Sequence, residues 1–190
     1  MDYINRLLDE NYDWGDERID EDTYDELSAD LIIDYLKKHD PETRQMLVLS
    51  WNFDNSKKVI QWIVDQPDTD KGTILLLYWL MAPDFSKQYA TREDCESAAS
   101  WYLEDYDIIQ SIERNYLSGF YKDQRYAFDP RHDVYQNGHD WTAENFKVPI
   151  PQEMFTALNG ITLDAPASWD EGIPEDLQPA MNRLCDLVDE

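Results

Sequence analysis

The chain has 190 residues, with 41 Asp and Glu against 16 Lys and Arg, so its formal net charge is -25. Because nucleic acids and anionic membranes bind proteins through cations that neutralise phosphate groups, this charge excludes both as partners. The chain is nevertheless 42% hydrophobic and 13% aromatic, which excludes a disordered acidic tail. Its length is that of one domain, and we expect a single helical domain over residues 1–190.

The negative charge is densest at the start of the chain, where the first thirty residues hold twelve acids and two bases. We define residues 1–22 as the acidic N-terminal segment. Aromatic residues lie among its acids, a composition expected of an interface anchor with a polar rim and equally of rings that pack on the body of the protein. The residues predicted to bind a partner are Asp13, Trp14, Asp16, Glu17, Asp20, Glu21 and Asp22.

Two helices are expected in the sequence that follows. Apolar residues recur at three- and four-residue spacing over residues 23–38, which predicts an amphipathic helix. Asp40 followed by Pro41 is a helix start signal, because aspartate caps a helix and proline suits its first position. This signal predicts a second helix that continues to Leu49.

The next two helices enclose the most apolar part of the chain. Ser56 is expected to cap the third helix, and Pro67 to end it, because the residue before a proline is disfavoured in the α region. Asp70 opens the fourth helix, over residues 72–81, which is apolar on nearly every face. A short helix of this kind must be surrounded by others, so we expect it at the centre of the fold.

Two further helices are predicted towards the C-terminus. Thr91 with Asp94 three residues later is a variant of the capping box, and it predicts one long helix that ends near Gly119. The last helix is expected over residues 174–188, where apolar residues fall on one side.

Between these helices, over residues 120–172, the helical periodicity fails. Proline and glycine recur there in a segment rich in aromatic residues, which predicts an ordered but irregular segment with a short helix around residues 152–158. No alternating strand pattern of convincing length occurs anywhere. The predicted fold class is therefore all-α, a compact multi-helix domain with an irregular aromatic-rich segment before its last helix.

One stretch, residues 47–80, carries a recognisable pattern: a Trp-Asn-aromatic-Asp turn, an amphipathic helix that ends before a proline, and Asp-x-Gly-Thr at the start of an apolar helix. The residues that form it are Trp51, Asn52, Phe53, Asp54, Pro67, Asp70, Gly72 and Thr73. This pattern resembles the bacterial family called domain of unknown function 4274, over about a fifth of the chain. The resemblance implies a helical hairpin and a bacterial origin.

The residues of the motif also have a direct structural interpretation. Asn and Asp side chains cap and end helices through bonds to the backbone, and Gly72 permits a helix to approach closely. A ligand site at the turn is the alternative. The chain departs from the family pattern at Asn55, Ser56 and Lys71, where the family carries Asp, Gly and Leu, and these departures bear on a binding role for the turn.

Candidate chemistry is confined to one segment, which includes Asp129, His132, Asp133, His139 and Asp140. Its spacing matches no zinc motif and no facial triad, so we expect no metal site, although a metal-dependent hydrolase that uses His132 to Asp140 remains an alternative. The chain has no nucleophile elbow and no phosphate-binding glycine loop. We therefore expect neither catalysis nor a cofactor.

The functional hypothesis rests on charge. A net charge of -25 exceeds the roughly 2 to 8 units that keep a small domain soluble, so a basic protein partner is expected. The favoured function is a bacterial immunity protein that binds and neutralises a basic toxin such as a nuclease, and the alternative of the same class is a DNA mimic that inhibits a DNA-binding protein. The start, MDYINRLLDENYDW, lacks a signal-peptide pattern, so a cytoplasmic location is expected.

Overall fold

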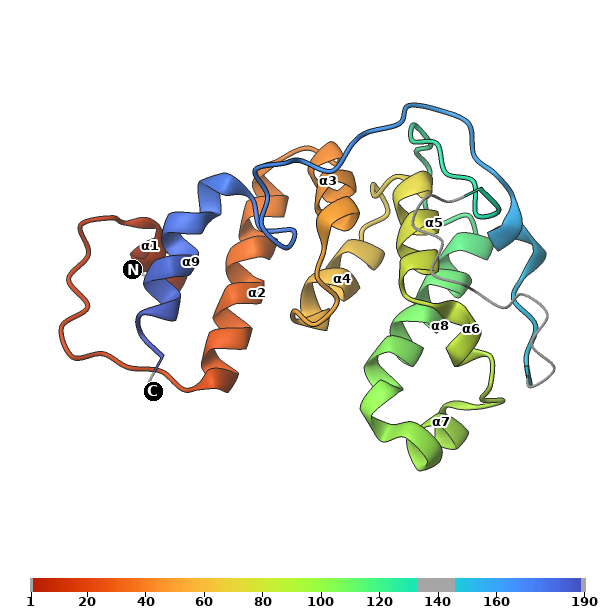
Figure 1. The fold of residues 1–190 in the computed structure, drawn as a ribbon, viewed down its shortest axis with the longest axis horizontal. Coiled ribbons are helices and arrows are strands. Elements are labelled where there is room, and N and C mark those ends of the chain that lie inside the picture. The colour runs from red at the N-terminus through yellow and green to blue at the C-terminus, as the bar shows by residue number, and fades with distance from the viewer. Residues whose placement is uncertain (1, 133–145, 189–190) are drawn as a thin grey trace. The chain divides into compact units, whose positions relative to one another are not determined.

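The structure is a computed structural model that describes residues 2–132 and 146–188, and within them it is helical without a β-strand (Figure 1). The expected all-α fold is confirmed. Its elements are α1 (Tyr3–Leu8), α2 (Glu21–Lys38), α3 (Glu42–Ser50), α4 (Lys57–Val64), α5 (Lys71–Leu80), α6 (Pro83–Ser86), α7 (Arg92–Ala99), η1 (Ser100–Tyr102), α8 (Leu103–Leu117), η2 (Gln152–Phe155), η3 (Glu175–Leu177) and α9 (Gln178–Cys185).

The chain divides into two compact units, and the single domain expected over the whole chain stays a prediction. The terminal unit consists of Met1–Trp62 and Asp164–Glu190, and the central unit of Ile63–Leu163. No helix in the described ranges combines the length and the apolar character needed to cross a bilayer.

In the terminal unit, α1, α2 and α9 pack together around buried leucines such as Leu7, Leu36 and Leu184 (Figure 1). Arg183 of α9 donates from Nε to the Leu7 carbonyl oxygen at 2.8 Å, which joins the two ends of the chain. The sequence pattern did not predict α1, because a helix of six residues is too short to show a periodicity.

Two predicted boundaries of this unit are wrong by a few residues. The first predicted helix was expected from residue 23, but α2 begins at Glu21 because the side chain of Asp20 accepts a hydrogen bond from the Thr23 backbone N–H at 2.8 Å. The last predicted helix, residues 174–188, is shorter: η3 occupies its start, and α9 ends at Cys185. The start signal at Pro41 is followed by α3 from Glu42.

The central unit is built around α5, as predicted, and residues 72–79 of this helix are all buried. Trp79 is 1% exposed and its Nε1 donates to the Met154 carbonyl oxygen at 2.9 Å. On the preceding residue of α5, the Tyr78 hydroxyl donates to Glu113 of α8 at 2.6 Å, and Lys87 forms an ion pair with the same carboxylate at 2.5 Å. The apolar helix α5 is therefore enclosed by α8 and by the irregular segment.

Asp70 joins the start of α5 to that irregular segment. Its carboxylate accepts hydrogen bonds from the backbone N–H groups of Gly72 at 2.7 Å, Arg125 at 2.5 Å and Tyr126 at 3.4 Å. A Cβ at Gly72 would lie 2.3 Å from the Tyr126 carbonyl oxygen. Gly72 therefore permits the close approach of the irregular segment at Tyr126. The expectation that Gly72 permits a helix to approach is wrong, because the backbone that approaches it is not helical.

The one long helix predicted from Thr91 to near Gly119 is also wrong. The capping box of Thr91 and Asp94 is present and starts α7, but the backbone leaves the helical region at Ala99, with φ -152°, and resumes in η1 and α8. Arg92 and Asp107 form an ion pair at 3.0 Å, whereas fifteen residues of straight helix would separate them by about 22 Å. The chain therefore folds back so that α7 packs on α8.

The irregular segment is confirmed in its described parts, residues 120–132 and 146–172. It contains isolated bridges that pair Tyr126 with Ile161 and Phe128 with Leu158. The short helix expected over residues 152–158 is the 3₁₀ turn η2.

The two tryptophans Trp79 and Trp101, both in the central unit, provide a matched test of this packing. Trp79→Ala is expected to lower the free energy of unfolding by about 3 to 5 kcal/mol, because it leaves a cavity in the core. Trp101 is 76% exposed and its ring lies beside those of Phe85 and Tyr102, so Trp101→Ala is expected to cost less than about 1 kcal/mol. Urea unfolding measures both. Equal losses would contradict the central position of α5.

Candidate functional site

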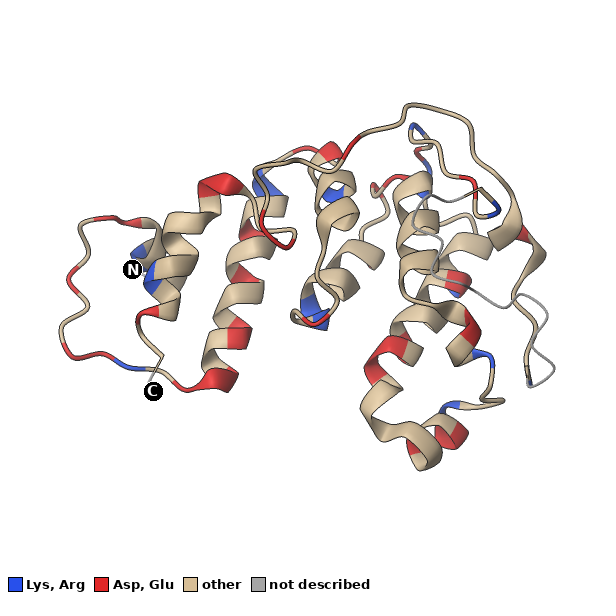
Figure 2. Cartoon of the chain, viewed as in Figure 1, with Lys and Arg blue, Asp and Glu red and all other residues tan. Residues whose placement is uncertain are grey.

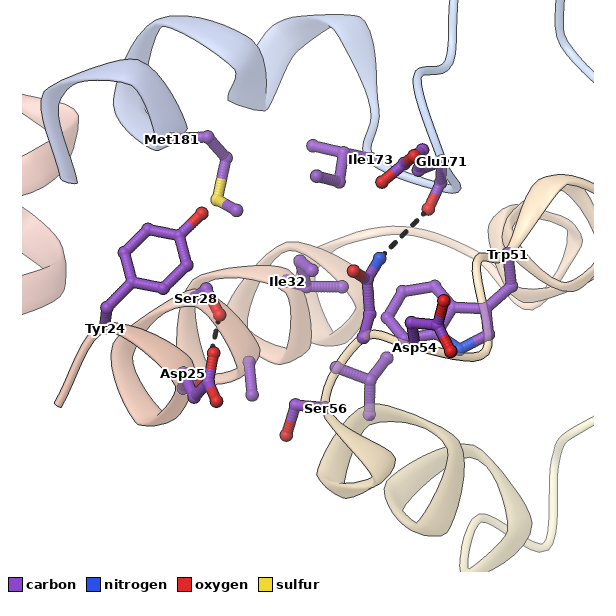
Figure 3. Close-up of a pocket in the computed structure, with 13 residues that line it drawn as sticks. Tyr24, Asp25, Ser28, Ile32, Trp51, Asp54, Ser56, Glu171, Ile173 and Met181 are labelled. Carbon is purple, nitrogen blue, oxygen red and sulfur yellow. Dashed lines mark hydrogen bonds between the residues drawn. The ribbon is translucent and has the colours of Figure 1, made fainter. Parts of the chain in front are cut away.

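The terminal unit contains a pocket of about 150 Å³ beside the motif turn (Figure 3). Its walls come from α2, from the turn between α3 and α4, from the first turn of α4, from the segment before η3, and from α9. The residues that line it are Tyr24, Asp25, Ser28, Ala29, Ile32, Trp51, Asp54, Asn55, Ser56, Val59, Glu171, Ile173 and Met181.

The motif turn is shaped by its own polar side chains. The Asn52 side-chain oxygen accepts from the Asp54 backbone N–H at 2.9 Å, and the Asn52 carbonyl accepts from the Asn55 backbone N–H at 3.1 Å. These bonds end α3 and turn the chain towards α4, as asparagine does in turns. Trp51, the residue after α3, is 6% exposed and forms part of the pocket wall.

The opposite wall comes from a tight turn more than a hundred residues later in the chain. Glu171 and Gly172 both have positive φ, 50° and 85°, and the Ile173 backbone N–H donates to the Asp170 carbonyl at 2.8 Å, as in a type I′ turn. The Glu171 carbonyl accepts from the Asn55 side chain at 3.3 Å (Figure 3).

Gly172 fixes this turn against Trp51. A Cβ on Gly172 would lie 2.8 Å from the indole atom Cε3 of Trp51, so only glycine fits between the turn and the ring. The pocket therefore depends on a contact between two segments that are far apart in the sequence.

The pocket is acidic. Asp25, Asp54 and Glu171 line it, and no Lys or Arg does. Within residues 2–132 and 146–188 none of the three carboxylates forms an ion pair, and Lys58, the cation next to the pocket residue Val59, binds Asp30 at 2.7 Å. Among the described residues, their negative charges are thus left without a neutralising cation.

Two aromatic side chains line the pocket together with the acids. The indole Nε1 of Trp51 is buried and has no hydrogen-bond partner among the described residues, an arrangement that costs free energy until an acceptor is supplied. Burial raises the pKa of Tyr24, with smaller effects of Cys185 and Asp25, so its phenol stays protonated at neutral pH. The pocket thus combines carboxylate acceptors with two aromatic side chains.

The acidic N-terminal segment forms a separate cluster around Arg6. The Arg6 guanidinium binds both carboxylate oxygens of Glu17, at 2.9 and 3.2 Å, and lies over the rings of Tyr3, Tyr12 and Trp14, with its carbon atom Cζ 4.1 to 5.2 Å from their centroids. The Tyr12 hydroxyl accepts from Arg6 at 3.2 Å, and this bond and the pair with Glu17 raise the pKa of Arg6. Trp14 and Glu17 thus stabilise this segment internally.

The other predicted partner-binding residues of the segment lie at the surface. They form no ion pair within the part of the chain that the structure describes, and they are Asp13, Asp16, Asp20, Glu21 and Asp22. Asp20 also caps α2, and the hydrogen bonds from Thr23 lower the pKa of its carboxyl group. None of these acids lines the pocket.

The remaining candidate residues lie elsewhere. Of the predicted motif, Pro67, Asp70, Gly72 and Thr73 belong to the central unit and line no part of the pocket. His132 pairs with Asp129 at 2.8 Å, and this hydrogen bond lowers the pKa of Asp129. Asp133, His139 and Asp140 are outside the described residues. Within the described ranges, no three His, Cys, Asp or Glu side chains gather as metal ligands.

Residues 39–117 match the family model described as "Domain of unknown function (DUF4274)". The match confirms the resemblance expected from the motif and extends it over α3 to α8. No curated protein and no solved structure matches the chain. The DUF4274 segment supplies one side of the pocket, with Trp51 and Asp54, whereas Asp25 and Glu171 lie outside it.

Sequence reasoning missed the pocket residues contributed by α2 and by the late turn. The pair Glu171 and Gly172 carried a usable signal, since a glycine next to a polar residue is typical of tight turns. Nothing in the local pattern indicated that this turn packs on Trp51.

Because of the Arg6 cluster, we expect two charge-neutralising substitutions in the acidic N-terminal segment to change the free energy of unfolding by different amounts. Glu17→Gln removes a charged partner of Arg6 and is expected to lower the free energy of unfolding by about 1 kcal/mol. Asp16→Asn removes the same charge from an exposed side chain and is expected to change it by less than about 0.5 kcal/mol. Denaturant unfolding with Trp fluorescence measures both. An identical response would show that the cluster adds nothing beyond net charge.

Proposed function

We propose that the chain is a non-catalytic acidic binding protein, an immunity protein that binds and neutralises a basic toxin such as a nuclease. The observation that carries this proposal is the surplus of acidic residues in the terminal unit. This unit has 24 Asp and Glu against 8 Lys and Arg, whereas the central unit has 17 against 8. Figure 2 shows acids along the segment between α1 and α2 and along α2 itself.

The physical argument is one of compensation. Repulsion among like charges destabilises a compact chain, and the surplus here is larger than solubility requires. A partner with a cationic cleft, such as an enzyme that binds phosphate backbones, relieves this repulsion on binding. Complementary charge also steers the two proteins together, so that an inhibitor can bind before its target acts.

The proposed setting follows from the sequence. The resemblance to a bacterial family supports a bacterial origin, and the proposed place of action is the cytoplasm. An immunity protein acts in the compartment where its own toxin is made.

A capture experiment tests this function. The tagged full chain is used to isolate proteins from cells that naturally contain it, and each captured protein is expressed alone and together with the chain. The expected result is a basic protein that arrests growth alone and is harmless with the chain. Capture of acidic proteins only, or growth arrest that the chain does not relieve, would overturn the proposal.

The kinetics of the complex provide a further prediction. Asp16, Glu21 and Asp22 are exposed and have no ion pair among the described residues, so the variant Asp16→Asn/Glu21→Gln/Asp22→Asn should fold normally. It should reduce the association rate more than it raises the dissociation rate, because exposed charges act mainly on encounter. Surface plasmon resonance against the captured protein measures both rates.

The control variant is Glu93→Gln/Glu104→Gln/Glu153→Gln, which removes the same charge from exposed positions of the central unit. It should affect the association rate less. Raising ionic strength from about 0.01 M to 1 M shortens the Debye length from about 30 Å to about 3 Å, and should abolish the difference between the two variants. Equal effects at low salt would place the partner elsewhere than on the acidic N-terminal segment.

A further inference from the structure

We propose that the pocket beside Trp51 binds one arginine side chain of the partner protein, with the carboxylates of the pocket on the guanidinium group and the rings of Tyr24 and Trp51 beside it. This inference rests on the proposed function and names the group that the basic partner inserts. It also differs from it in location, because the pocket residues are not those of the acidic N-terminal segment.

The size of the pocket suits a single planar group. Its volume is about 150 Å³. A protein cavity of about 150 Å³ admits benzene, so a guanidinium group with the end of its side chain fits. A folded surface or a helix does not enter such a space, which restricts the occupant to one inserted side chain.

The arrangement of charge favours an organic cation over a metal ion. Asp25 comes from α2, Asp54 from the motif turn and Glu171 from the late turn, so the carboxylates approach the pocket from three separate segments (Figure 3). Within the described residues no three such side chains are close enough to hold one ion. A guanidinium group presents five N–H donors in a plane and can reach acceptors on several sides.

The aromatic residues explain the preference for arginine over lysine. Tyr24 and Trp51 form walls of the pocket, and guanidinium groups stack on aromatic faces more readily than ammonium groups do.

The test uses a blocked arginine, N-acetyl-arginine methylamide, titrated into the full chain. NMR follows the indole N–H signals, and Trp51→Phe identifies the signal of Trp51 by its loss. The expected result is a saturable shift of the Trp51 signal. N-acetyl-citrulline methylamide, which has the same shape without the charge, should cause no such shift. A Trp51 signal that stays in place, or that moves equally with citrulline, would overturn the inference.

Charge-matched variants separate the pocket from diffuse attraction. Asp25→Asn/Asp54→Asn is expected to raise the dissociation constant of the probe at least about tenfold, which corresponds to about 1.4 kcal/mol. Asp16→Asn/Asp22→Asn removes the same charge outside the pocket and should change it less than about twofold. Equal weakening by the two variants would overturn the site in favour of general electrostatics.

A third variant guards against loss of folding. Glu171→Gln keeps the backbone carbonyl that holds the turn, because only that carbonyl, and not the carboxylate, bonds to Asn55. It should weaken probe binding while the Trp51 signal of the free protein stays in place. If the probe fails while the chain still relieves toxin arrest, the pocket inference falls and the proposed function stands. If the probe binds and no toxin is found, the pocket stands and the proposed function falls.

Discussion

The shortage of basic residues is the constraint on which the rest of this structure depends. With 16 Lys and Arg among 190 residues, the chain has few cations with which to join one element to another. Arg6 holds the acidic N-terminal segment through Glu17, Lys58 joins α4 to α2 through Asp30, and Arg92 joins α7 to α8 through Asp107. Because the cations are engaged within the fold in this way, the surface that remains is acidic.

In the central unit, one such ion pair between elements is buried. Lys87 is 1% exposed, and its ammonium group meets Glu113 together with the hydroxyl of Tyr78. Burial and the nearby Glu113 carboxylate raise the pKa of Tyr78, so the phenol remains a donor. Removing one partner of such a pair leaves an uncompensated buried charge, so the three residues act as one unit that positions α8 against α5.

The pocket of the terminal unit, in contrast, is lined by acids without a cation among the described residues. Among the described residues, no Lys or Arg lines the wall on which its three carboxylates lie. This is the deficit that the proposed arginine of a partner would meet. The positive φ of Glu171 keeps one of these acids at the pocket although an L-residue rarely adopts it, which is the kind of strain found at binding sites.

Local patterns in the sequence predicted the helical class, the buried centre at α5, the caps at Asp70 and Thr91, and the family segment, because each depends on residues within a few positions of one another. The break at Ala99 and the contact of Gly172 with Trp51 became apparent in the folded chain. The first depends on the packing of α7 against α8, and the second on a contact across more than a hundred residues. Neither leaves a local pattern, because a periodicity records which face of an element is buried and not which distant segment buries it.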